Sequence, residues 1–257
     1  MADRNDGTPM NTLGFFAALA CLIGSIGNTA KASDPQLLEP TLHLMHRGSA
    51  RPEVALTLDA CGGGVDLRIL DALIRNGIPA TVFVSARWLR RNPEAFARLR
   101  ANPDLFEIEN HGRDHVPAVD RPLTVFGLAA AGSLPAVEAE VSGGAAAIVT
   151  AGGQAPHWFR GATARYSITA IAAIRAMGYR IAGYSLNGDG GASLSAEETA
   201  DRIAAARDGD VILAHLNQPG RAAGAGVVQG LLRLQSRGFR FVRLLDTEET
   251  GSDGTVD

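Results

Sequence analysis

The sequence has little cysteine, few aromatic residues and no run of basic residues. Two cysteines, Cys21 and Cys61, in 257 residues exclude a scaffold held by several disulfides. A net charge of -3 and an aromatic content of 5%, without a basic stripe, argue against a nucleic-acid partner. What is present is an ordinary globular composition, 46% hydrophobic and 20% charged, in a length that allows one large core.

The N-terminus carries an apolar run, LGFFAALACLIGSIG, followed by small residues at Ala30 and Ala32. We interpret residues 1–32 as a cleaved signal peptide, which predicts a periplasmic or secreted protein with a mature domain over 33–257. The alternative is an N-terminal membrane anchor, but the run is shorter than the roughly 20 apolar residues of a spanning helix. We therefore expect no stable membrane span after cleavage, and Cys61 as the only remaining thiol.

Short apolar runs alternate with helical patterns along the mature chain. Helices are expected at 66–76, 93–101, within 124–141, and at 167–177, 196–206 and 226–237. Strands are expected at 54–59, 79–85, 105–110, 156–160, 180–186, 210–215 and 240–245. This alternation predicts right-handed βαβ units, and therefore a single α/β domain around a parallel sheet. Periodicity alone leaves open whether the sheet closes into a barrel.

Polar residues stand at or just past the carboxyl ends of these predicted strands. They are Asp59, Asn110, His111, His115, Arg160, Asn187, Asp189 and His215. Parallel α/β folds build their active sites at this edge, from the loops that follow the strands. We therefore expect these side chains to meet in one site.

The strongest local signal is the segment ENHGRDH, in which His111 and His115 are four residues apart. If the segment is helical, both imidazoles lie on one face, and imidazole is the commonest protein ligand of zinc-like ions. Glu107 and Glu109 fall on the same strand face as His111 by the period of two. Two carboxylates on a buried face indicate either a cation or a hydrogen-bond network.

These residues, in this order, resemble the polysaccharide deacetylases of carbohydrate esterase family 4, the NodB-homology domain. The first motif of that family, TFDDG, is similar to TLDAC at 57–61, and its NH with a spaced histidine matches NHGRDH at 110–115. FRGATARY resembles its arginine motif without the usual proline. LNGDGG resembles its acidic motif loosely, and LAH at 213–215 matches its Leu-x-His. The resemblance runs from Val54 to Leu245.

The resemblance implies a distorted (β/α) barrel of about seven parallel strands and metal-dependent removal of an N-acetyl, or sometimes O-acetyl, group from a glycan. Carried over by position, Asp59 is the general base and His215 the general acid. Arg160 orients Asp59, while His111 and His115 hold a divalent metal, for which zinc is our preference. The partner is then an N-acetylated glycan. Which glycan, and the oligomeric state, stay open.

Ala60 departs from the family, whose second aspartate at this position is the third metal ligand. Three outcomes are open: Asp59 shifts to ligation, Glu109 supplies the carboxylate, or the metal is weakly held or lost. Our preferred interpretation is a metal on the two histidines, with Asp59 and water completing the shell.

Two other classes of function compete with this one. Cys61, on a strand-to-helix turn of small residues, is a candidate nucleophile that His111 or His215 could activate, although the family has glycine there. A non-catalytic, glycan-binding pseudo-deacetylase is the second alternative, because Ala60 removes a ligand.

Overall fold

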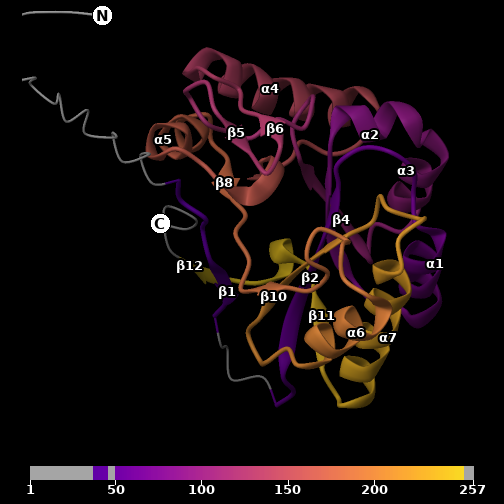
Figure 1. The fold of residues 1–257 in the computed structure, drawn as a ribbon. Helices are drawn as coiled ribbons and strands as arrows, with labels where there is room; N and C mark the ends of the chain where they lie inside the picture. Colours follow the sequence, from indigo (N-terminus) through magenta and orange to yellow (C-terminus); the bar gives the residue numbers. More distant parts are fainter. Residues whose placement is uncertain (1–36, 46–49, 252–257) are drawn as a thin grey trace, which may run out of the picture. The chain divides into compact units, whose positions relative to one another are not determined.

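The structure, a computed structural model, describes residues 37–45 and 50–251 (Figure 1). The predicted signal peptide therefore lies outside the described residues. Those that are described belong to one compact unit. None of their helices is long and apolar enough to cross a bilayer.

The core of the fold is an eight-stranded sheet in which every pairing is parallel. The neighbour order is β8-β7-β4-β3-β2-β10-β9, and β11 pairs with the first half of β2. The bounds are β2 Glu53–Ala60, β3 Ala80–Val84, β4 Phe106–Asn110, β7 Trp158–Phe159, β8 Arg180–Ile181, β9 Leu186–Asn187, β10 Val211–His215 and β11 Arg240–Val242. All seven predicted strands are thus present, and β9 is added.

The sheet curls into a distorted half-barrel, as the resemblance implied. Its path ends at β8 and β9, and the described residues contain no pairing between these two strands. The two faces of the strands differ in chemistry. Along β2, Leu56, Leu58 and Ala60 belong to the apolar cluster under the helices, whereas Thr57 and Asp59, on the other face by the period of two, are buried among polar groups.

Seven α-helices cover the described sheet: α1 Leu67–Asn76, α2 Ala86–Arg91, α3 Pro93–Arg100, α4 Leu134–Thr150, α5 Ile168–Ala176, α6 Ala196–Ala204 and α7 Ala223–Ser236. Figure 1 shows α6 and α7 side by side. Ser195 and Glu198 form a complete capping box at the start of α6, and Gly77 ends α1 in the left-handed region.

Residues 124–150 contain a hairpin and a long helix. Strands β5 Thr124–Val125 and β6 Leu128–Ala129 pair through a two-residue turn, and α4 then begins with Pro135 in its first turn, where proline is tolerated. The helix predicted within 124–141 therefore begins at Leu134 and continues past the predicted range to Thr150. Helix α4 also includes Gly144, at which an added Cβ would clash with Asn110 and Gly112. Glycine here lets α4 approach the loop after β4.

Three further elements were not predicted. Helix α2 has six residues, capped by Ser85, and is too short for a clear 3.6-residue period. Strands β1 Leu42–Leu44 and β12 Glu249–Gly251 pair antiparallel with each other. Their partners are about 200 residues apart in sequence, so no local pattern could indicate the pairing.

Candidate functional site

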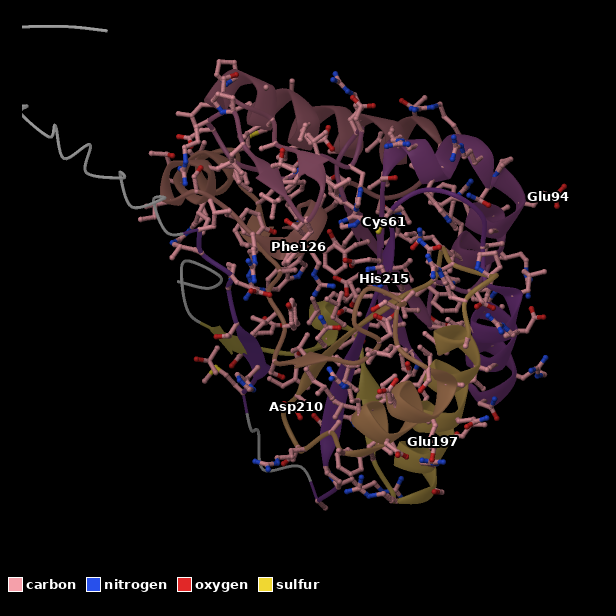
Figure 2. All side chains as sticks on the ribbon, in the orientation of Figure 1. Cys61, Glu94, Phe126, Glu197, Asp210 and His215 are labelled. Carbon is pink, nitrogen blue, oxygen red and sulfur yellow. The ribbon has the colours of Figure 1, made fainter. Side chains whose placement is uncertain are left out.

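Asp59 and His215 are direct neighbours on adjacent strands. In the parallel register of β2 and β10, His215 is the partner of Asp59, and both stand at the carboxyl ends of their strands. Figure 2 shows His215 and Cys61 close to the centre of the molecule. The register explains how two residues 156 positions apart meet, and it could not be read from either segment alone.

Arg160 is completely buried and pairs with Asp59. Its Nη1 (NH1) group donates to Asp59 Oδ1 at 3.0 Å and to Thr57 Oγ1 at 2.9 Å. Its Nε and NH2 donate to the carbonyl oxygens of Ala182 and Gly183, and the guanidinium lies over the Phe83 ring. A buried guanidinium with every side satisfied holds the carboxylate of Asp59 in one orientation.

The protonation state of Asp59 follows from these neighbours. Burial raises the pKa of its carboxyl, but the charges of His111 and Arg160 outweigh burial and hold the pKa below its ordinary value. His215 lowers it further. Asp59 is therefore ionised at neutral pH.

His215 is held by Asp189, a buried carboxylate in the loop after β9. Asp189 accepts the backbone N–H of His215 at 2.7 Å and lies 3.0 Å from its Nδ1. Burial lowers the pKa of His215, but Asp189, together with Cys61, raises it well above the ordinary value. His215 therefore carries a proton at neutral pH. The sequence placed Asp189 at a strand end but gave it no role, because the pairing depends on tertiary structure.

His111 and His115 meet without a helix. Residues 111–115 form a loop with left-handed backbone at Gly112 (φ 86°) and at His115 (φ 58°), which brings the two imidazole centroids to 4.8 Å. The buried carboxylate of Glu140, on α4, accepts the backbone N–H groups of Asp114 and Val116. A distant glutamate thus fixes this loop, and no sequence pattern indicated it.

Cys61 joins the two histidines. Its Sγ is 3.4 Å from His111 Nε2, and the donor atoms of Cys61, His111 and His115 all lie within 4.8 Å of one another. Burial raises the pKa of the thiol, but His111, followed by His115 and His215, lowers it well below the ordinary value. This donor set fits a divalent cation such as zinc, which thiolate and imidazole ligands favour. Asp59 stands next to the set, with Oδ2 3.7 Å from His111 Nε2.

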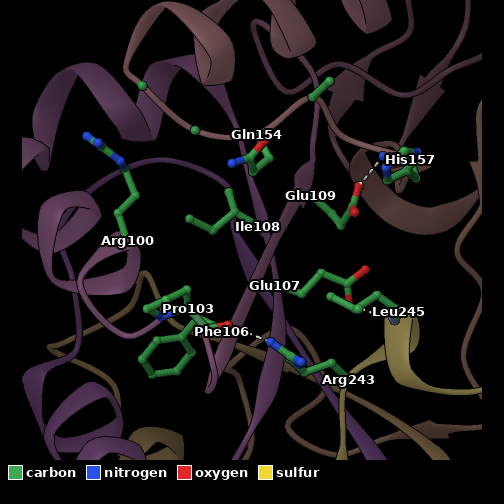
Figure 3. Close-up of a pocket in the computed structure, with 13 residues that line it drawn as sticks. Arg100, Pro103, Phe106, Glu107, Ile108, Glu109, Gln154, His157, Arg243 and Leu245 are labelled. Carbon is green, nitrogen blue, oxygen red and sulfur yellow. Dashed lines mark hydrogen bonds between the residues drawn. The ribbon is translucent and has the colours of Figure 1, made fainter.

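The structure does not bring Glu109 to the donor set. Its Oε2 accepts the backbone N–H groups of His157 and Trp158, and with Glu107 it lines a separate cavity of about 610 Å³ (Figure 3). None of the predicted catalytic or metal-binding residues lines this cavity. The alternative in which Glu109 supplies the missing carboxylate has no support in this geometry.

Glu109 is instead expected to affect the stability of the fold. Burial, with Glu107 close by, raises its pKa to about 9, so the folded chain keeps a proton that the unfolded chain releases near pH 4.5. The contribution of Glu109 to stability is complete below the unfolded pKa and is lost as the pH rises toward 9. We expect Glu109→Gln to raise the free energy of unfolding by about 2 kcal/mol at pH 7.

Urea unfolding at several pH values measures this effect. The gain in the free energy of unfolding of Glu109→Gln over the wild type should grow from pH 5 to pH 8. The exposed Glu138→Gln on α4 is the matched control, and a Glu109→Gln variant with the same pH dependence as the wild type would contradict the prediction.

Comparisons with known proteins identify structures of the same fold. No curated protein matches the chain in sequence, but solved structures do. An acetyl xylan esterase of family 4 from Clostridium thermocellum, in complex with cobalt, is 26% identical, with a TM-score of 0.60 over 75% of this chain and 88% of its own. A peptidoglycan N-acetylglucosamine deacetylase is 20% identical, with a TM-score of 0.64 over 80% and 90%.

A pseudoenzyme of the same family, from Bacillus anthracis, is 18% identical, with a TM-score of 0.61 over 77% of this chain and 66% of its own. The model of the polysaccharide deacetylase family matches residues 46–182, which is more than half of the 257 residues. This span contains Asp59, both candidate metal-binding histidines and Arg160. The chain therefore belongs to the polysaccharide deacetylase family, which places it among hydrolases that act on carbon–nitrogen bonds other than peptide bonds.

Proposed function

We propose that the protein is a metal-dependent deacetylase that removes N-acetyl groups, or O-acetyl groups, from an extracytoplasmic polysaccharide or oligosaccharide. One observation carries the proposal: an ionised Asp59 and a protonated His215 are register partners on adjacent strands, beside a set of metal-binding donors. A base and an acid with opposite pKa shifts are what hydrolysis of an amide requires.

His111 and His115 would hold the cation. A divalent cation supplies Lewis acidity, which polarises the acetyl carbonyl and lowers the pKa of a water molecule. Asp59, fixed by Arg160, accepts a proton from the attacking water. His215, fixed by Asp189, donates a proton to the departing amine, which is otherwise a poor leaving group.

The proposed substrate class draws on the relatives. The structural neighbours include proteins described as deacetylases of peptidoglycan N-acetylglucosamine and as an acetyl xylan esterase, and a substrate of this kind lies outside the cytoplasm. A periplasmic or secreted location also follows from the predicted signal peptide at 1–32.

A glycan-binding protein without activity is the second candidate, favoured by two observations. Ala60 stands where the family has a carboxylate ligand, and one neighbour is described as a pseudoenzyme. Ionised Asp59 and protonated His215 oppose this candidate, because binding alone requires neither.

Acetate release from a panel of N-acetylated glycans tests the proposal. We expect release with zinc or cobalt, loss of at least a hundredfold with a chelator, and recovery when metal returns. Glycan binding without acetate release in the presence of metal would favour the non-catalytic candidate. Alkylation of Cys61 provides a further test. If it abolishes activity even when the metal is present in excess, the result would favour Cys61 as a nucleophile.

A further inference from the structure

The face of β2 decides which side chain can replace the missing carboxylate. Ala60 belongs to the apolar cluster with Leu58 and Val84, and its side chain is fully buried there. Asp59 lies on the opposite face, and Cys61, two residues further, returns to the side of Asp59. The Sγ at 3.4 Å from His111 Nε2 agrees with this placement. Position 61, not position 60, therefore faces the histidines.

Two of the three donors already have the spacing of ligands to a single ion. With bond lengths of about 2.0–2.3 Å, the donor atoms of a tetrahedral zinc site lie roughly 3.5 Å apart. The Cys61 to His111 distance of 3.4 Å is close to this value. The set with His115 spans up to 4.8 Å, so its donors must move closer together by about 1 Å for all three to bind one ion. Three protein donors with the fourth position open is the arrangement of a catalytic zinc site.

Groups around the donors fix their orientation. His111 Nδ1 is 2.5 Å from the carbonyl oxygen of Arg160. This oxygen accepts a hydrogen bond from Nδ1–H, which leaves Nε2 to face Cys61. Ser85 Oγ donates to the Cys61 carbonyl, and Asn217 Nδ2 donates to the Gly62 carbonyl at 2.6 Å. Fixed orientation of ligands by their neighbours is typical of metal centres, whereas a nucleophilic thiol needs only one adjacent base.

We propose that Cys61 is the third protein ligand of the metal, bound as a thiolate whose proton is released to solvent. This proposal rests on the metal dependence proposed above. The centre then consists of one thiolate and two imidazoles, and Asp59 stays free to act as the base. A soft sulfur ligand selects zinc or cobalt and disfavours magnesium and calcium, which prefer oxygen ligands.

Cobalt spectroscopy of the metal-free full chain tests the proposal without a substrate. A thiolate bound to Co²⁺ gives an intense near-ultraviolet charge-transfer absorption that nitrogen and oxygen ligands do not give. We expect this band in the wild type at one equivalent of Co²⁺, its loss on addition of Zn²⁺, and no effect of excess Mg²⁺. Cys61→Ser should lack the band and bind Zn²⁺ at least tenfold more weakly.

Two further variants complete the experiment. Cys61→Asp should lack the band but retain more Zn²⁺ affinity than Cys61→Ser, because it returns a carboxylate to the donor set. His157→Gln, which changes a histidine of the separate cavity, should keep the wild-type spectrum. Circular dichroism of each metal-free variant checks that it folds.

The outcomes distinguish this proposal from the proposed function. If the wild type binds cobalt without showing the charge-transfer band, the proposal that Cys61 is a thiolate ligand is overturned. The deacetylase proposal is then left intact. The band together with a complete lack of acetate release supports the ligand and overturns the deacetylase. Failure to bind Co²⁺ or Zn²⁺ at all overturns both.

Discussion

Replacing Asp59 with asparagine is expected to lower the kcat of acetate release by about 10³-fold, because general-base catalysis contributes about 10²–10⁴-fold. Asparagine keeps an oxygen that can accept the bond from Arg160 NH1, now 3.0 Å from Asp59 Oδ1, but it takes no proton from water at neutral pH. The measurement is kcat per metal-loaded molecule, with KM determined separately.

The matched control is Asp210→Asn. Asp210 lies just before β10, at the opposite end of the strand from His215, and accepts hydrogen bonds from Ser185 and Arg207. The Asp210→Asn variant should retain most of the activity of the wild type. Metal content should stay near one equivalent in Asp59→Asn, since the proposed ligands are unchanged. A loss of less than tenfold, with metal retained, would mean that another group is the base.

The sequence predicted the sheet well, because parallel strands buried on both faces form short apolar runs that end in turns. Most of the polar residues at the carboxyl ends were also correctly brought together, since that edge is shared by all strands of a parallel sheet. The side chains of Asn110 and Asn187 instead form hydrogen bonds with nearby backbone groups. His111 and His115 do meet, although not through a helix. Their loop depends on Glu140 and on left-handed backbone at His115, neither of which has a local sequence signal.

The place of Cys61 was the largest difference. The sequence favoured Asp59 and water to complete the shell of a metal on the two histidines. It offered Cys61 only as an alternative nucleophile, because the family has glycine there. The fold instead brings the thiol among the imidazoles of His111, His115 and His215. The alternation along β2 already placed Cys61 on the face of Asp59, but that signal has meaning only once the strand is known to continue through Ala60.

Arg160 carries the second large effect, this time on stability. We expect Arg160→Met to lower the free energy of unfolding by about 3–5 kcal/mol, because it leaves the buried carboxylate of Asp59 without its partner. It also leaves the carbonyl oxygens of Ala182 and Gly183 without their donor. Methionine keeps much of the side-chain volume, so the loss reports the charge and hydrogen bonds more than packing. Urea unfolding measures it.

The double variant Asp59→Asn with Arg160→Met separates the ion pair between these two residues from the other interactions of Arg160. Asparagine carries no charge to leave unpaired, so the double variant should be more stable than the sum of the two single losses predicts. Additive losses would mean that Arg160 stabilises the fold only through Thr57, Ala182 and Gly183.

The pH profile of activity shows whether Arg160 positions the catalytic carboxylate of Asp59 or has a purely structural role. Arg160 is among the charges that lower the pKa of Asp59, so its removal raises that pKa and moves the acidic limb of kcat/KM to higher pH. Arg165→Met, five residues along the same loop and paired with Glu39, is the matched control and should leave the limb in place. An unmoved limb in folded Arg160→Met would restrict Arg160 to a structural role, because the base would then titrate independently of its buried partner.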